Sequence, residues 1–472
     1  MKVLIASHNL GKISEFKEIL STVGFDFLTL NDLADVEEPE EYGLTLNENS
    51  LIKAKYYYDL FKLPVIADDT GLFIDDLGGE PGIKAARYSG FGDKENRELV
   101  LKKLNGKISN AHFETVLTFY DGTNVITSNG VMLGKITNKE AGTNGFGYDS
   151  IFYLPKYDKT VAELCPGIKN TISHRFNAIC NLKRKIEFFN DCNKELDYIK
   201  SEFLKNLQEE ILDIEKIPGG MSNNTFKVTT KNGTYTARIP GINAELFVGR
   251  MYELEALNKV KDNFTFVQYN YFDIQSGFKV SPYILKETTD VDYHFIANTL
   301  NQMHALPKFN NDFNPFERFL YYERLVNIFD MPLSSKFDVL KNKLFKYRDF
   351  LEQRELVACH NDAQLSNHIQ TKNGNVLIDF EFTGNNDLLF DFACLGNDDL
   401  NIGKEAYKIA VKRQINNEED KAIELWYSLQ ALSWYLVAMF KYATGMNQTT
   451  GLDFNNIATF FLIKAENLLK KY

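Results

Sequence analysis

A charged stretch with a helical pattern and without proline or glycine, from residue 175 to residue 215, separates two differently patterned halves of the chain. Before it, short apolar runs alternate with helical runs, and after it come two hairpin patterns and long helical runs. A single hydrophobic core rarely grows beyond roughly 250 to 300 residues, and this chain has 472. The sequence therefore predicts two domains, residues 1–193 and residues 194–472, with a helical connection.

The half before this stretch follows an α/β pattern. The apolar runs at residues 2–7 and 64–69 are typical of buried strands, and residues 11–24 and 44–61 have helical periodicity. Residues 112–136 alternate apolar and polar side chains around the turn sequence DGTN, which indicates a hairpin. We therefore expect an α/β domain with a mixed central sheet.

The half after this stretch begins with strands and continues with helices. The sequence KNGT at residues 231–234 predicts a hairpin turn, and residues 368–380 predict a second hairpin. Helical periodicity dominates the remainder of the chain. A strand-rich small lobe before a helical large lobe predicts an α+β, two-lobed domain like that of protein kinases.

The charge and the apolar runs disfavour several classes of protein. A net charge of −11 argues against a nucleic-acid-binding protein, because phosphate backbones attract an excess of Lys and Arg. The sequence contains no run of about 18 apolar residues, so we expect no membrane span. The apolar run at the N-terminus is too short for a secretory signal. The five cysteines form no CxxC pair and are expected to be reduced thiols. We expect a cytoplasmic protein.

Six segments of the first half carry residues suited to phosphate and purine chemistry. They are SHNLGK (7–12), EEYGLTLNENSLIKAK (40–55), ADDTGL (67–72), PGIKAARYSG (81–90), GFGYDSIF (145–152) and KNTISHR (169–175). In the first segment, the start of a helix would direct backbone N–H groups, Asn9 and Lys12 toward an anion. A simple capped turn is the alternative.

Two adjacent carboxylates, Asp68 and Asp69, end a predicted buried strand. They repel each other there and are hard to tolerate without a cation. Mg²⁺ takes oxygen ligands and bridges to phosphates, so the pair favours a magnesium site, with a solvated strand-end loop as the alternative. In GFGYD, two aromatic rings beside glycines suit stacking on a base, although an aromatic core turn has the same pattern.

In this order, the six segments resemble the Ham1 family of inosine triphosphate pyrophosphatases, over residues 1 to about 190. The family's T/S-x-N-x-x-K opening, acidic pair before S/T-G-L, S-A-R-Y-S-G-like turn, F-G-Y/W-D and closing S-H-R all have counterparts here. The resemblance implies hydrolysis of noncanonical purine nucleoside triphosphates (ITP, dITP, XTP) to the monophosphate and pyrophosphate. By analogy with the family, we expect a homodimer through this domain.

The resemblance also implies roles for individual residues. Asp69 would be the catalytic base for the attacking water, and Glu41, Asp68 and Asp69 would hold Mg²⁺. The other substrate-binding residues implied are Lys12, Lys53 and Lys169 for the phosphates, Phe146 and Tyr148 for the purine, Asp149, His174 and Arg175 for its edge, and Ser7, His8, Asn9, Thr70 and Gly147. His8 stands where the family often has Gly. A Maf-like pyrophosphatase, acting on modified pyrimidine or methylated purine nucleotides, is the competing interpretation.

The second half carries a phosphotransfer pattern in LVACHNDAQLSNHIQTKNGNVLIDFEF, residues 356–382. An Asp-x4-Asn spacing followed by a strand-borne Asp is the arrangement that kinase-type enzymes use. Asp362 would accept the proton of the acceptor hydroxyl, and Asn367 and Asp379 would hold Mg²⁺ on the ATP phosphates. A polar hairpin with capping residues is the alternative.

Around this pattern, residues 195–472 resemble the choline/ethanolamine kinase family. GGMSNNTFKV, TARIPG and GRMYELEAL match its nucleotide loop, its basic strand and its R-x-x-E helix. The resemblance implies ATP binding through Ser222, Asn223, Arg238 and Glu253, with Glu253 as the acidic partner of Arg238.

The resemblance further implies a small alcohol, choline or ethanolamine, as acceptor. Choline is a quaternary ammonium ion held by aromatic rings and acid, for which Trp434 and Glu381 are the candidates, followed by Phe382 and Tyr435. Val437 stands where the family often has a second Trp. An aminoglycoside- or thiamine-type kinase, or a nucleotide-binding regulator without turnover, are the competing interpretations.

Overall fold

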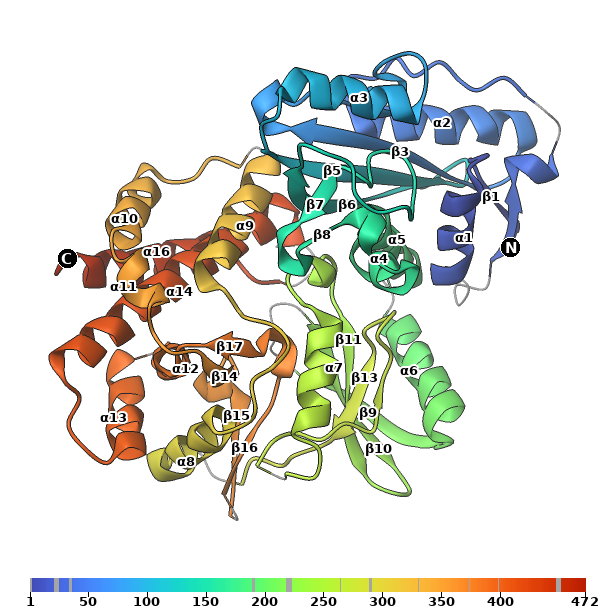
Figure 1. The fold of residues 1–472 in the computed structure, drawn as a ribbon. Helices are drawn as coiled ribbons and strands as arrows, with labels where there is room; N and C mark the ends of the chain where they lie inside the picture. Colours follow the sequence, from blue (N-terminus) through green and yellow to red (C-terminus); the bar gives the residue numbers. More distant parts are fainter. Residues whose placement is uncertain are drawn as a thin grey trace. The chain divides into compact units, whose positions relative to one another are not determined.

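The computed structural model describes residues 2–20, 25–33, 36–188, 192–217, 223–263, 265–287, 291–329, 331–372, 374–397, 399–446 and 451–472 (Figure 1). Of the predicted site residues, Ser222 lies outside these ranges. The chain forms two compact units: Met1–Gln208 with Pro240–Phe247, and Glu209–Ile239 with Val248–Tyr472.

The first unit extends past residue 193, where the sequence predicted the domain boundary. Helix α6 (Cys192–Leu207) belongs to this unit and buries Ile199 and Phe203. The segment Pro240–Phe247 belongs to it as well, because Arg184 forms a buried ion pair with Glu245. The described residues on either side of residue 193 are helical, up to Phe188 and from Cys192 to Leu207, as predicted.

The first unit is built on one mixed sheet, which confirms the predicted α/β class. Its strands, in the order β2-β1-β3-β5-β6-β7-β8 with β4 paired to β3, are β1 (Lys2–Ile5), β2 (Asp26–Thr29), β3 (Val65–Ile74), β4 (Pro81–Gly82), β5 (Ser109–Tyr120), β6 (Val125–Ile136), β7 (Phe152–Leu154) and β8 (Lys159–Thr160). Strand β1 pairs parallel with β2 and β3, whereas β3, β5 and β6 pair antiparallel. The other helices are α1 (Leu10–Ile19), α2 (Leu46–Phe61), α3 (Asp93–Leu104), α4 (Pro166–Ile172) and α5 (His174–Phe188).

Alternate residues of the central strands pack against helices on opposite faces of the sheet. Ile66 of β3 packs with residues of α1 and α5, and Val65 and Ala67 pack with residues of α2. Figure 1 shows α2 on one side of the sheet and α5 on the other. Because side chains alternate along a strand, Asp68 continues the face of Ile66 and Asp69 continues the face of Ala67.

The predicted hairpin of residues 112–136 is formed by β5 and β6, which pair along their whole length. In its turn, the Asp121 carboxylate accepts hydrogen bonds from the backbone N–H groups of Thr123 and Asn124, at 2.9 and 2.7 Å. This Asx-type turn is the reason DGTN closes the hairpin at this point.

The second unit begins with a five-stranded antiparallel sheet in the order β12-β13-β11-β10-β9. The strands are β9 (Ile211–Ile217), β10 (Asn223–Thr230), β11 (Thr234–Pro240), β12 (Tyr271–Phe272) and β13 (Lys279–Pro282), and helix α7 (Arg250–Lys259) follows β11. The KNGT hairpin is confirmed. The prediction that residues 211–215 are helical is wrong, because their backbone pairs antiparallel with β10.

The rest of the second unit is helical apart from two short strand pairs, as the kinase-like layout predicted. Its helices are α8 (Tyr293–His304), α9 (Pro315–Ile328), α10 (Ser335–Phe345), α11 (Arg348–Glu352), α12 (Leu388–Leu395), α13 (Leu400–Val411), α14 (Asn417–Ala443) and α16 (Phe454–Leu469). Strands β14 (Val357–Cys359) and β17 (Gly384–Asn386) form one pair, and β15 (His368–Thr371) and β16 (Gly374–Leu377) form the predicted second hairpin. Within the described ranges, no helix is long and apolar enough to cross a membrane.

Candidate functional site

In the first unit, the two adjacent aspartates meet different cations. Asp68 Oδ2 accepts a hydrogen bond from Lys12 Nζ at 2.6 Å and lies 4.0 Å from Arg175 Nε. Burial favours the neutral form of Asp68, but Lys12 and Arg175 outweigh it and hold its pKa well below the ordinary value. Arg175 is in turn paired with Glu15, 3.0 Å away. Asp68 is therefore an ionised partner of two cations, the buried Arg175 and the partly buried Lys12.

Asp69 lies on the other face of β3 with Glu41 and Lys53. The Lys53 ammonium forms ion pairs with Glu41 and, at 3.6 Å, with Asp69 Oδ1. Asp69 is 7% exposed, and its Oδ2 has no hydrogen-bond partner among the described residues. Burial raises the pKa of Asp69. The charge of Lys53 lowers this pKa, and the charge of Glu41 raises it further.

These carboxylates fit a hard divalent cation. Glu41 and Asp69 converge on one ammonium, and a buried carboxylate oxygen without a partner is costly unless a ligand satisfies it. Mg²⁺ prefers carboxylate oxygens and phosphate oxygens over nitrogen or sulfur. Glu41 and Asp69 are thus better suited to hold such an ion than Asp68, whose oxygen is engaged with Lys12.

The SHNLGK segment forms a capped helix start beside Asp68. Asn9 is the N-cap of α1, and its side chain accepts from the backbone N–H of Lys12 at 3.1 Å. Ser7 Oγ accepts from the backbone N–H of Asn9 at 3.2 Å, while His8 Nδ1 lies 2.8 Å from Asn31 Oδ1. Burial lowers the pKa of Lys12, so its charge is sensitive to what binds beside it.

The aromatic ring of Phe146 lies near two cations. Lys169 Nζ is 4.8 Å from the ring centroid and the Arg175 guanidinium carbon is 5.7 Å from it, while 40% of Phe146 is exposed. Lys169 is fixed by Asp149, whose Oδ2 is 2.8 Å from Nζ. Phe146 is thus a partly exposed aromatic residue with two positive charges close to its ring.

Tyr148 and His174 have different environments from Phe146. Tyr148 is buried in the core with its hydroxyl donating to the carbonyl of Ala85 at 2.7 Å, so its ring face is not presented to solvent. His174 stacks on Phe113, is 7% exposed, and its Nδ1 has no partner within the described part of the chain. Burial lowers the pKa of His174 well below the ordinary value, which keeps the imidazole neutral.

Thr70 and Gly147 occupy supporting positions. Thr70 Oγ1 lies 2.8 Å from Thr115 Oγ1 on the neighbouring strand. The carbonyl of Gly147 accepts from Arg97 at 2.8 Å, and the Gly147 N–H donates to Asp93 at 3.0 Å.

Sequence reasoning missed three charged residues of the first site, namely Glu15, Arg87 and Arg97. Arg87 pairs with Glu41, and its position in the quoted segment PGIKAARYSG was the one available signal. Glu15 and Arg97 stand on helices far along the chain from their partners, and no motif contains them.

In the second unit, the predicted trio gathers after β14 and β16. The side-chain amide of Asn367 donates to Asp362 Oδ2 at 3.0 Å and to the Asp362 carbonyl at 2.8 Å. Burial raises the pKa of Asp362 well above its ordinary value, and the charge of Asp379 adds to this effect. Asp379 is not strand-borne as predicted: β16 ends at Leu377, and Asp379 adopts a left-handed φ of 69°. Non-glycine residues in that region are concentrated at functional sites.

Arg238 contacts the carboxylates at this site. Its Nη1 donates to Asp379 Oδ1 at 2.5 Å and to Glu381 Oε1 at 3.1 Å, and Asn223 donates to the same Glu381 oxygen at 2.8 Å. Burial opposes ionisation of both acids, but Arg238 holds the pKa of Asp379 below its ordinary value. Burial and the charge of Asp379 raise the pKa of Glu381.

The predicted pairing of Arg238 with Glu253 is wrong. Glu253 on α7 forms its ion pair with Lys279 at the start of β13, and both residues are buried. Arg238 instead reaches Asp379 and Glu381, because these carboxylates follow β16 and face its strand.

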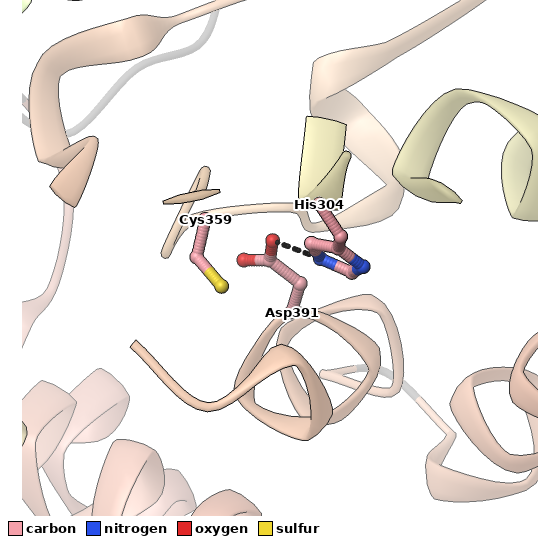
Figure 2. A group of neighbouring side chains, drawn as sticks. All are labelled: His304, Cys359 and Asp391. Atoms are coloured by element: carbon pink, nitrogen blue, oxygen red, sulfur yellow. Dashed lines mark hydrogen bonds and ion pairs between the residues drawn. The ribbon is translucent and has the colours of Figure 1, made fainter. Parts of the chain in front are cut away.

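A buried carboxylate holds the loop that precedes Asp362. Asp391 accepts hydrogen bonds from His304 Nε2 at 2.9 Å and from the backbone N–H groups of His360 and Asn361 at 3.0 and 2.6 Å. Figure 2 shows His304, Cys359 and Asp391 converging, with the dashed contact joining His304 and Asp391.

Ligand atoms of these three residues lie within 4.8 Å of one another, a spacing that a metal ion could bridge. Burial raises the pKa of the Cys359 thiol well above its ordinary value, and the thiol lies 3.4 Å from the carbonyl oxygen of Asn386. Because the Asp391 carboxylate already accepts three hydrogen bonds, we interpret the cluster as an anchor for the loop.

The four acceptor candidates contact separate partners among the described residues. Trp434 stacks with Phe461, and Tyr435 accepts a hydrogen bond from the backbone N–H of Ser334 at 2.9 Å. The ring of Phe382 lies 4.9 Å from the Arg318 guanidinium carbon, and Glu381 pairs with Arg238 as above. These contacts do not join the four residues into one aromatic cage.

Comparisons with known proteins agree with this division into two units. Residues 3–185 match the Ham1 family, and residues 213–421 match the phosphotransferase enzyme family. The dITP/XTP pyrophosphatase of Halalkalibacterium halodurans is 42% identical over 190 residues, which cover 39% of this chain and 98% of that protein. The dITP/XTP pyrophosphatase of Bacillus subtilis is 42% identical over 192 residues, covering 39% of this chain and 97% of that protein.

The second unit has a match among solved structures. The crystal structure of choline kinase LicA from Streptococcus pneumoniae aligns with a TM-score of 0.51 and 25% sequence identity, covering 59% of this chain and 99% of that one. Through its own residues 3–185, the present chain belongs to the Ham1 family, and it carries in addition a domain of the phosphotransferase enzyme family.

Proposed function

We propose that the first unit hydrolyses noncanonical purine nucleoside triphosphates (ITP, dITP and XTP) to the monophosphate and pyrophosphate. The observation that carries this proposal is the buried Oδ2 of Asp69, which has no hydrogen-bond partner in the described part of the chain and lies beside Glu41 and Lys53. The raised pKa of Asp69 supports its role as the base that takes a proton from water. Two relatives that are 42% identical carry the name dITP/XTP pyrophosphatase.

The other residues divide between the two ends of the substrate. Lys12, Lys53 and Lys169 would neutralise charge that builds on the phosphates, and the exposed face of Phe146 would stack on the purine. Glu41 and Asp69 would hold Mg²⁺, which neutralises phosphate charge and polarises the reacting phosphoryl group when bound.

Selectivity would depend on the neutral ring of His174, whose buried Nδ1 has no partner among the described residues. A hydrogen bond to a 6-oxo purine, with no partner for an amino group, discriminates by about 1 to 3 kcal/mol, or roughly tenfold to over a hundredfold.

The test is pyrophosphate release from ITP, dITP, XTP, GTP and ATP at equal concentration with Mg²⁺. The proposal predicts kcat/KM for ITP at least about tenfold above that for GTP. Turnover of ITP no faster than GTP, with faster turnover of a methylated or modified nucleotide, would favour the Maf-like alternative.

For the second unit, we propose ATP-dependent phosphorylation of a small alcohol, choline or ethanolamine. The observation that carries it is the assembly of Asp362 and Asn367 on a loop held by Asp391. Asp362 would accept the hydroxyl proton, and its raised pKa suits that role near neutral pH. Asn367 and Asp379 offer oxygen ligands to Mg²⁺, which bridges the ATP phosphates when bound.

ADP release in the presence of matched acceptors tests this proposal. Choline, ethanolamine, thiamine and an aminoglycoside should be compared under the same conditions, with Asp362→Ala as the inactive control. Faster turnover of choline or ethanolamine supports the proposal, and faster turnover of thiamine or the aminoglycoside supports the corresponding alternative. If no acceptor gives ADP above the Asp362→Ala control, the regulator interpretation gains.

We also propose a homodimer through the first unit. Large apolar side chains on its surface include Phe91, 87% exposed, and Leu44, 86% exposed, which a partner could cover. Light scattering of the intact chain tests this, and a monomer at micromolar concentration would contradict it.

A further inference from the structure

Lys279 lies directly opposite Arg238 in the sheet of the second unit. Strands β11 and β13 pair antiparallel, and their register joins Ala237 to Val280 and Arg238 to Lys279. Side chains of directly opposed residues stand on the same face of a sheet, within about 5.5 Å of each other at Cβ. The sheet therefore presents two cations side by side, of which only Arg238 belongs to a motif.

Of the two cations, Lys279 is the one held by the acid of helix α7. The side chains of Lys279 and Glu253 are 8% and 3% exposed and form an ion pair. A buried ion pair gains little stability over an apolar pair of the same volume, so its presence calls for another reason. In kinase folds, a glutamate on the helix after the small-lobe strands pairs with a lysine and holds it against the ATP phosphates.

Arg238 is engaged elsewhere. Its guanidinium contacts Asp379, a proposed Mg²⁺ ligand, and Glu381. Lys279 stands on the same face of the sheet, because it lies directly opposite Arg238 in the register of β11 and β13. The Lys279 ammonium is therefore on the side of the sheet from which Arg238 reaches these carboxylates.

We propose that Lys279, supplied by β13 and positioned by Glu253, is the cation that binds the ATP phosphates in this chain. This inference rests on the proposed phosphotransfer function and adds to it a residue that the motifs did not contain. Arg238 then balances Asp379 and Glu381, and the ATP-binding role that the resemblance gave to Arg238 passes to Lys279 on the neighbouring strand.

Binding of Mg²⁺-ATP and of adenosine to the intact chain, measured by calorimetry, tests the assignment. For Lys279→Met we expect Kd for ATP to rise about 10- to 100-fold, because a charge-assisted contact to phosphate is lost. Adenosine lacks phosphates, so its Kd should stay unchanged. Lys279→Arg keeps the charge and should recover most of the ATP affinity, with the remaining loss in KM for ATP rather than in kcat.

Lys227→Met is the matched control, since Lys227 lies on β10 of the same sheet and its side chain is 36% exposed in an ion pair with Glu215. It should change neither Kd. Lys279→Met leaves Glu253 buried without its partner, so a second variant, Lys279→Met with Glu253→Met, removes both charges and preserves folding. This double variant should show the same loss for ATP alone.

An equal rise in Kd for ATP and adenosine, or no change in either, would overturn the role of Lys279. If the unaltered chain binds ATP tightly and Lys279→Met binds it equally well, only this inference fails. If the unaltered chain binds neither ATP nor ADP, the proposed phosphotransfer fails with it.

Discussion

Asp68 and Asp69 adjoin in the sequence, yet Asp68 meets the ammonium of Lys12 at 2.6 Å while Asp69 meets that of Lys53 at 3.6 Å. Strand geometry separates them, because consecutive side chains point to opposite faces of β3. The two aspartates therefore occupy different surroundings, Asp68 as an anion paired with Lys12 and Asp69 as a candidate base beside Lys53.

Replacement of Asp68 should make the first unit less stable in a pH-dependent way. Asp68→Asn leaves Lys12 and Arg175 without their shared anion, which should cost about 3 kcal/mol at pH 7. Folding lowers the pKa of Asp68, so Asp68 makes its full contribution to the free energy of unfolding at pH values above its pKa in the unfolded chain, about 3.9. This contribution is lost progressively as the pH falls below that value. Hydrogen exchange of β3 measures this, and an equal difference at pH 7 and pH 3 would contradict the account.

The pH profile of phosphotransfer should show its acidic fall in rate at a higher pH than an ordinary aspartate would give. Burial raises the pKa of Asp362, so the ionised base forms only as the pH rises well above its ordinary value of about 3.9. The rate of ADP release at saturating ATP and acceptor should therefore increase with pH from pH 5. A profile that is flat from pH 5 to pH 8 would show that Asp362 is already ionised at pH 5.

The base selectivity of the first unit should not depend on pH near neutrality. Because burial lowers the pKa of His174 well below its ordinary value, the imidazole stays neutral between pH 6 and pH 8, where a free histidine of pKa about 6.5 would titrate. The ratio of kcat/KM for ITP to that for GTP should stay constant over this range. A ratio that changes with a midpoint near pH 6.5 would mean that His174 titrates there.

Asp391 should control phosphotransfer without contacting substrate. Asp391→Asn replaces one acceptor oxygen by a donor facing the N–H groups of His360 and Asn361, and we expect kcat to fall about 10- to 100-fold with little change in KM for ATP. Cys359→Ala is the control, because it should lower kcat as much as Asp391→Asn only if the cluster of His304, Cys359 and Asp391 were a metal site. Fluorescence reports the folding of this unit, because Trp426 and Trp434 both lie in it.

Local sequence patterns predicted those elements whose conformation depends on residues close in the sequence. The alternation of residues 112–136 and the turn DGTN specify the β5–β6 hairpin within one segment, and the Asp362 and Asn367 spacing lies within one loop. The helix prediction for residues 211–215 was wrong because their charge pattern suits a helix, whereas pairing with β10 decides their conformation.

Contacts between distant segments could not be predicted. Lys279 and Glu253 stand 26 residues apart on elements whose packing the sequence does not specify. The burial of Tyr148 likewise depends on the carbonyl of Ala85, 63 residues away. In both cases the contact joins elements that are far apart in the sequence, so residue type alone did not indicate it.

If one chain carries two independent phosphate-handling sites, a variant in one site should leave the activity of the other unchanged, and a crossed pair of variants measures this. Pyrophosphate release from ITP and ADP release with choline or ethanolamine should be measured for the unaltered chain, Asp69→Asn and Asp362→Ala. We expect Asp69→Asn to lose pyrophosphate release by at least about 100-fold and keep ADP release, and Asp362→Ala to do the reverse. Retention of pyrophosphate release in Asp69→Asn, or of ADP release in Asp362→Ala, would contradict the account.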